Sequence, residues 1–118
     1  MPFDLGIWNP GVTAGVSKPR RIDFDRVNAA ALRSSEAVVR GLLPAGRRDG
    51  MEWVARNPLR NDRKPGSFKV NLATGKWGDF ATSDRGGDLV SLAAFVAALL
   101  QREAAIRLAE SLGVDPYA

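Results

Sequence analysis

Neither cysteine nor histidine occurs anywhere in this sequence of 118 residues. No disulfide and no thiolate or imidazole zinc site can therefore hold the fold together. The same absence excludes cysteine nucleophiles and histidine-based catalytic triads. Among metal cofactors, only cations bound by carboxylate oxygens, such as Mg²⁺, remain available. The fold must be held by hydrophobic packing, and apolar residues make up 45% of the chain, which allows one modest core.

A chain of this length is expected to form one domain, with no room for a second catalytic domain. Its N-terminus lacks the basic and apolar regions of a signal peptide, and no apolar run approaches the about 20 residues that cross a bilayer. We therefore expect a cytoplasmic protein without membrane contact. Lys and Arg number 17 against 13 acidic residues, a formal charge of +4, and arginine suits bidentate contacts to phosphate.

The first half of the chain predicts an irregular arm followed by a helix. Residues 1–22 are rich in Gly, Pro and small polar residues and predict a basic arm, which leaves residues 23–118 as a single domain. Asp25 is placed to cap a helix that runs to Leu43. The apolar stripe of this helix comprises Val27, Ala31, Leu32, Ala37 and Val38.

Strand patterns begin at Met51. Three extended runs, over residues 51–55, 67–72 and 76–81, predict strands. The last two are joined by a turn that contains Gly75, where a positive φ is expected, so they form a β-hairpin. Its candidate core or cross-strand contacts are Phe68, Val70, Trp77 and Phe80.

Two helices are expected after the hairpin. The turn over residues 83–88 ends in Asp88, the predicted N-cap of a helix over residues 89–100. A final helix over residues 102–112 ends at Gly113. The fold class is therefore α+β, with a small antiparallel sheet packed with an N-terminal helix and two C-terminal helices.

Positive charge is concentrated between Arg47 and Lys76. This segment holds eight cations and three acidic residues, a surplus of five that exceeds the net charge of the whole chain. A local positive field attracts a phosphate backbone. Aromatic residues in or beside it either stack an unpaired base or belong to the core; they are Trp53, Phe68 and Trp77. The predicted nucleic-acid-binding residues are Arg56, Arg60, Arg63, Lys64, Lys69, Lys76, Trp77 and Arg85.

Acidic residues suggest no catalytic site. Asp79, Asp84 and Asp88 lie within ten residues and have the oxygen ligands that Mg²⁺ needs. However, Asp88 is expected to cap a helix and Asp84 lies beside Arg85, so turn and cap roles are the better interpretation. Gly75-Lys76 lacks the other residues of a phosphate-binding loop. We therefore predict a protein without metal, cofactor or enzymatic activity.

Three segments resemble the zinc-binding domain of DnaG-type bacterial and phage primases. They are residues 57–71, 77–80 and 86–89, which read NPLRNDRKPGSFKVN, WGDF and GGDL. That family has a Cys-Pro-x-His segment, a Pro-Ser-Phe-x-Val strand, a Cys-x-x-Cys knuckle and a Gly-Gly-Asp helix start. The closing run EAAIRLAESLGV is also similar to the family's final helix, so the resemblance covers about residues 53–114.

The resemblance fails at the metal ligands. Asn57 occupies the position of the first Cys and Arg60 that of the His. The third position is Asp79, and the fourth is Thr82 or Ser83. The resemblance therefore implies a zinc-ribbon-like scaffold with a degenerate zinc site, held without zinc.

These observations lead to two functional expectations. The first is a non-enzymatic module of a phage- or plasmid-associated DNA replication protein, which contacts single-stranded DNA through its basic hairpin. The alternative is a protein-interaction module, which docks a primase, helicase or other replication partner through its apolar helices without useful DNA binding.

Overall fold

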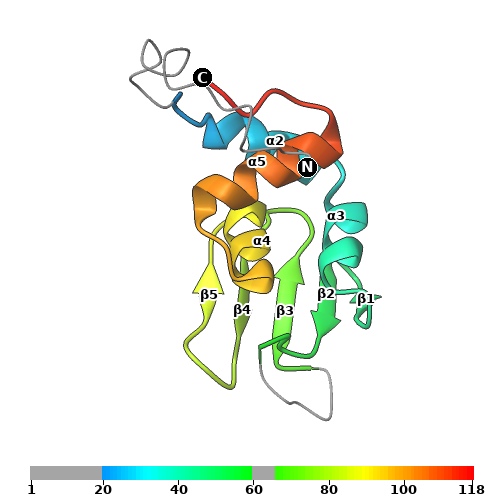
Figure 1. Cartoon of the computed structure of the whole chain (residues 1–118). Helices are drawn as coiled ribbons and strands as arrows, with labels where there is room; N and C mark the ends of the chain where they lie inside the picture. The colour runs from blue at the N-terminus through cyan, green and yellow to red at the C-terminus, as the bar shows by residue number, and fades with distance from the viewer. Residues whose placement is uncertain (1–19, 60–65) are drawn as a thin grey trace.

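The computed structural model describes residues 20–59 and 66–118. Within these ranges the chain forms a five-stranded antiparallel sheet with helices before and after it (Figure 1). The strands follow one another across the sheet in sequence order, so the predicted α+β class is confirmed. The elements in chain order are α2 (Phe24–Arg33), α3 (Ser35–Leu42), β1 (Arg47–Asp49), β2 (Glu52–Ala55), β3 (Phe68–Asn71), β4 (Trp77–Asp79), β5 (Arg85–Gly86), α4 (Leu89–Ala97) and α5 (Gln101–Leu112).

The core lies between one face of the sheet and the helices. The side chains of Phe68 and Trp77 project from this face toward the helices, and their rings lie 5.7 Å apart. The ring of Phe95 in α4 lies 5.9 Å from that of Phe68 and 4.9 Å from that of Trp77. The indole N–H of Trp77 donates to Ser91 Oγ at 2.9 Å. Gly86 is required beside it, because an added Cβ would lie 2.5 Å from Trp77 Nε1. Trp53, Phe68 and Trp77 are therefore core residues.

The single N-terminal helix predicted from the sequence is in fact two helices. Ser34 leaves the helical conformation, with φ −125° and ψ 38°, and separates α2 from α3. The break changes the phase of the apolar stripe. Ala37, predicted to face inward, is exposed, and Val39 occupies the buried position.

Helix ends follow local side-chain chemistry. Asp23, not Asp25, caps α2, because its carboxylate accepts the backbone N–H of residue 26 at 3.0 Å. The predicted Asp88 cap of α4 is confirmed, as is the end of α5 at Gly113. Helix α4 stops at Ala97, three residues earlier than predicted, where Ala98 adopts a left-handed conformation with φ 56°.

The three predicted strands are confirmed as β2, β3 and β4, and Gly75 has the expected positive φ of 81°. Two further strands flank them. β1 pairs with β2, and β5 pairs with β4 inside the segment predicted as a turn. Both are short edge strands.

The start and end of the described chain are joined. Ile22 forms an antiparallel bridge with Tyr117, and Asp23 N–H donates to Pro116 O at 2.8 Å. The guanidinium group of Arg26 donates to the carbonyl oxygens of Asp115 and Tyr117. Most of the predicted basic arm, residues 1–19, lies outside the described residues.

Among the described helices, no single one has the length and apolar composition to span a bilayer. Only α4 and α5 taken together meet those two criteria, and the chain bends by 107° between them.

Candidate nucleic-acid interface

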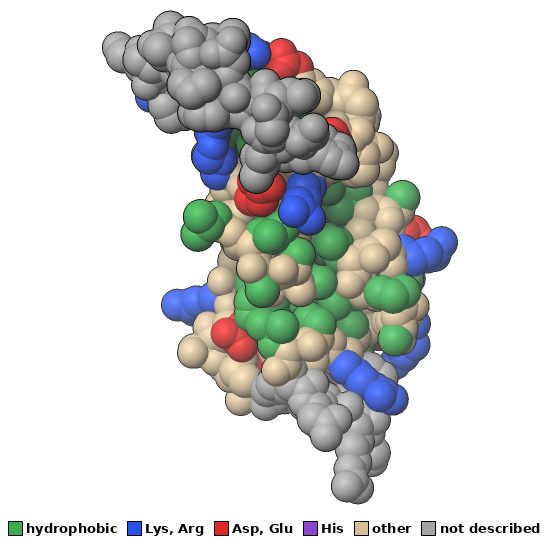
Figure 2. All heavy atoms as spheres, viewed as in Figure 1, with side chains coloured by type: hydrophobic (Ala, Val, Ile, Leu, Met, Phe, Trp, Pro, Cys, Tyr) green, Lys and Arg blue, Asp and Glu red, His purple; other side chains and the backbone are tan. Residues whose placement is uncertain are grey.

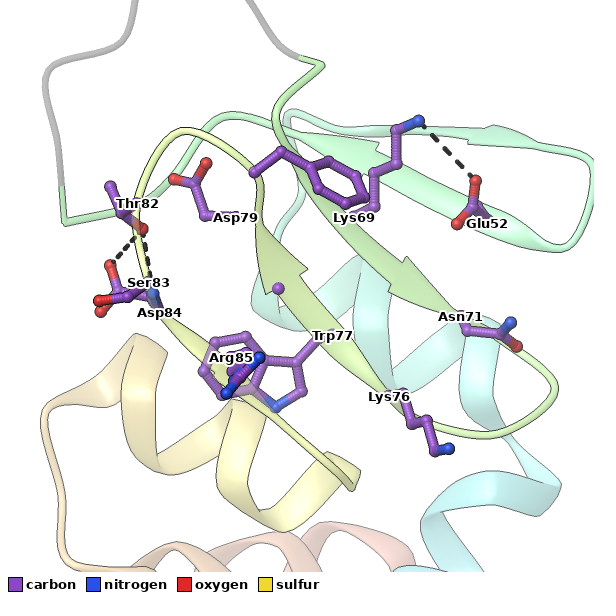
Figure 3. Close-up of a pocket in the computed structure, with 12 residues that line it drawn as sticks. Glu52, Lys69, Asn71, Lys76, Trp77, Asp79, Thr82, Ser83, Asp84 and Arg85 are labelled. Carbon is purple, nitrogen blue, oxygen red and sulfur yellow. Dashed lines mark hydrogen bonds and ion pairs between the residues drawn. The ribbon is translucent and has the colours of Figure 1, made fainter.

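The sheet face opposite the helices carries two of the predicted cations. Lys69 pairs with Gly78 across β3 and β4, and Gly78 pairs with Arg85 across β4 and β5. Directly opposed residues of an antiparallel sheet point to the same face, so Lys69 and Arg85 share it. We call this surface the open face of the sheet. Lys69 Nζ lies 4.0 Å from Glu52 Oε1 (Figure 3).

A hollow of about 680 Å³ occupies the open face between β3, β4 and the turn that leads to β5 (Figure 3). Lys69, Lys76 and Arg85 all line it. Its lining also includes Gly78, which has no side chain to fill it, and Asn71, whose amide already accepts two backbone N–H groups of the hairpin turn. In the described part of the chain, neither Lys76 nor Arg85 forms an ion pair. Both cations are exposed and available to an anionic ligand.

Phe80 is the exposed aromatic that sequence reasoning misplaced. It was predicted as a core or cross-strand contact, but its side chain is 80% exposed. Its ring lies 5.5 Å from Lys69 Nζ, and it lines the hollow. Trp77, by contrast, is 7% exposed and packed among Phe68 and Phe95. Trp77 therefore has no exposed ring face for the predicted stacking, and the exposed ring that lines the hollow is that of Phe80.

The alternation of strand side chains contained a signal for this correction. Trp77 and Asp79 point toward the helices, so Gly78 and Phe80 point away from them. Once Trp77 is assigned to the core, an aromatic three residues later belongs on the open face.

Of the other predicted site residues, Arg56 is exposed directly after β2. Three more, Arg60, Arg63 and Lys64, lie outside the described residues.

The acidic residues have the structural roles predicted for them. Asp88 caps α4, and Asp84 Oδ2 accepts the hydroxyl of Thr82 at 2.9 Å within the turn between β4 and β5. Asp79 is 4% exposed and faces the interior. Within residues 20–59 and 66–118, no three acidic side chains are arranged to hold a metal ion.

Asn57 and Asp79, which the primase resemblance places at two zinc-ligand positions, form a buried hydrogen bond. Asn57 Nδ2 donates to Asp79 Oδ2 at 2.8 Å. Asn57 Oδ1 accepts the N–H of Leu59, and Asp79 Oδ1 accepts the N–H of Ala81, both at 2.8 Å. These groups do not fit zinc, because the chain has no thiolate or imidazole and the amide donates to the carboxylate. The pair links the segment after β2 to the segment after β4 by hydrogen bonds.

Comparisons of the sequence with protein-family models and with curated proteins yield no match.

Proposed function

We propose that this chain is a non-enzymatic module of a DNA replication protein and contacts single-stranded DNA through the open face of its sheet. The observation that carries the proposal is the hollow on that face, whose lining includes Lys69, Lys76 and Arg85 and the exposed ring of Phe80, which lies 5.5 Å from Lys69 Nζ, together with the acidic residues Glu52, Asp79 and Asp84. Proteins that bind single strands combine a cationic groove for the backbone with aromatic rings for the bases. A replication role would place the protein with DNA in the cytoplasm.

The primase resemblance supports the replication context of this proposal. The hairpin of β3 and β4 coincides with the segment that carries the family's Pro-Ser-Phe-x-Val strand and the start of its second knuckle. The two matching ligand positions at residues 57 and 79 are close in space. We therefore propose a zinc-ribbon-like module in which hydrogen bonds take the structural place of zinc.

Removing the cations of the hollow tests the proposal. The triple variant Lys69→Ala, Lys76→Ala and Arg85→Ala is expected to bind a labelled single-stranded oligonucleotide at least about tenfold more weakly at low salt. Each lost phosphate contact lowers the dependence of log K on log salt by about 0.7 for single strands, so the slope is expected to fall by about 2. Fluorescence anisotropy at several salt concentrations measures both quantities.

A matched control removes the same charge elsewhere. Arg21, Arg33 and Arg107 are exposed and lie away from the open face. Alanine at all three lowers the net charge from +4 to +1, as the hollow variant does, since each variant loses three cations. The control is expected to keep most of the affinity and slope. Equal losses in both variants would show that only total charge matters and would reject the open face as the site.

Phe80→Ala is expected to weaken single-strand binding about tenfold, because stacking on an aromatic is worth about 1–3 kcal/mol per base. The salt slope should stay unchanged, since no cation is removed. Phe80→Tyr keeps an aromatic ring and is expected to bind like the parent chain. If Phe80→Ala binds the oligonucleotide as tightly as the parent chain in the anisotropy titration, bases do not stack on Phe80.

The alternative, a protein-interaction module, is favoured by a different surface. Helix α4 contains no charged residue, yet Phe95 and Val96 are only half-buried, and Leu100 at the start of α5 is 81% exposed. Figure 2 shows hydrophobic side chains gathered in the middle of the face that carries α4. Docking of a purified primase or helicase domain, together with no oligonucleotide binding even at low salt, would establish this function instead.

A further inference from the structure

The strand register aligns three cations in one row across the open face. Arg47 is opposite Val54, Val54 opposite Lys69, Lys69 opposite Gly78, and Gly78 opposite Arg85. These opposed residues share a face, so they form a row perpendicular to the five described strands. Within the row, cations on β1, β3 and β5 alternate with an aliphatic residue and a glycine.

The spacing and shape of this row suit an extended polyanion. Neighbouring strands lie about 4.8 Å apart, which places successive cations about 10 Å apart and the outer two about 19 Å apart. Gly78 has no side chain to obstruct a backbone that passes from Lys69 to Arg85. Val54, between Lys69 and Arg47, is only 4% exposed, so a backbone that continues to Arg47 passes over the atoms that cover it. In the described chain Arg47, like Arg85, forms no ion pair.

The neighbouring row limits where the polyanion can lie. Asp49 is opposite Glu52, and Glu52 is opposite Asn71. On β1 and β2 this parallel row is acidic, so a phosphate backbone shifted from Arg47 toward it meets carboxylates. A path along a strand is also less favourable, because the outward residues of β3 are one cation, Lys69, and one amide, Asn71.

We infer that a single strand of nucleic acid crosses the sheet perpendicular to its strands, from Arg85 through Lys69 to Arg47. Arg47 is thus a phosphate-binding residue, although it belongs to an edge strand outside the hollow. This inference rests on the proposed function and adds the direction and extent of the path. The contacts at the β5 end comprise Arg85, Lys69 and the ring of Phe80, and a short oligonucleotide can satisfy them without reaching β1.

Oligonucleotide length separates this path from binding in the hollow alone. With an oligothymidylate of about 12 nucleotides, Arg47→Ala is expected to weaken binding about fivefold to tenfold. An oligothymidylate of about 4 nucleotides is expected to bind near Phe80 without reaching Arg47, so Arg47→Ala is expected to bind it as tightly as the parent chain does. Both titrations use anisotropy at low salt, and thermal melts establish that the variants are folded.

Arg48→Ala is the matched control. Arg48 is adjacent on the same strand, but it is opposite Trp53 on the helix-facing side and pairs with Glu36 of α3. Its loss is expected to leave the affinity for both oligonucleotides unchanged. If Arg47→Ala behaves like Arg48→Ala on the longer oligonucleotide while Lys69→Ala weakens binding, the path is wrong and the proposed function stands. If the parent chain binds neither oligonucleotide, both are wrong.

Discussion

Phe68→Ala is expected to lower the free energy of unfolding by about 3–5 kcal/mol. Phe68 is fully buried, and its ring stacks on both Trp77 of the sheet and Phe95 of α4. Truncation removes these contacts and leaves a cavity that the surrounding close-packed side chains only partly fill. A typical domain is stable by about 5–15 kcal/mol, so one substitution removes a large fraction of the total. Urea denaturation monitored by the fluorescence of the buried Trp53 and Trp77 measures the loss.

Phe80→Ala is the matched control for stability. It makes the same chemical change at a ring that is 80% exposed. Its effect on the free energy of unfolding is expected to stay within about 0.5 kcal/mol, while it weakens binding of single strands. Comparing the two substitutions therefore distinguishes the face of the sheet that packs on the helices, which carries Phe68, from the open face, which carries Phe80. Equal destabilisation by both substitutions would contradict this assignment of faces.

Local patterns predicted the central part of the fold. Alternation over residues 67–72 and 76–81, with a glycine turn between them, indicated the hairpin of β3 and β4. Asp88 and Gly113 marked helix ends because their chemistry is local: a carboxylate accepts a nearby N–H, and glycine adopts a positive φ without strain. Such features need no knowledge of distant residues.

The elements that sequence reasoning missed depend on tertiary partners. β1 reads Arg-Arg-Asp and β5 has two residues, so neither shows an apolar alternation, and each exists through pairing with its neighbour. The break at Ser34 was missed because residues on both sides of it continue to favour a helix. Packing of α2 on α5 and of α3 on α4 determines the two directions.

The candidate site was predicted in composition but not in arrangement. Lys69, Lys76 and Arg85 were named from local charge, and the structure places them around one hollow. Phe80 was missed because an aromatic in a strand was assumed to be buried, although the assignment of Trp77 to the core reverses that assumption. Arg47 was missed as a site residue because its relation to Lys69 and Arg85 exists only in the register of the sheet.

Asp79→Ala is expected to lower the free energy of unfolding by about 3 kcal/mol, because it removes charge-assisted hydrogen bonds from the buried Asn57 amide and from a backbone N–H. The carboxylate accepts the amide of Asn57 and the backbone N–H of Ala81, both at 2.8 Å, and is 4% exposed. Asn57 itself is 1% exposed, so its amide has no ready access to water after the substitution. Urea denaturation measures the change.

Asp79→Asn separates the hydrogen bond that the carboxylate accepts from Asn57 from the one that it accepts from Ala81. The new amide has one oxygen, which accepts from Asn57 or from Ala81 but not from both in their present geometry, while its NH₂ group faces the other donor. The free energy of unfolding of Asp79→Asn is therefore expected to lie between that of the parent chain and that of Asp79→Ala. A double-mutant cycle with Asn57→Ala measures the direct coupling, expected at about 1–3 kcal/mol.

Chelation provides the independent test of the metal-free interpretation. A zinc-dependent domain unfolds when its metal is removed, whereas EDTA is expected to leave the melting temperature of this chain unchanged. Strictly additive costs at Asn57 and Asp79 would show that their hydrogen bond does not link the two segments. Coupling between them, with no response to EDTA, would support the proposal that an amide–carboxylate pair takes the structural place of two metal ligands, because it links the two segments in a chain that has no cysteine or histidine.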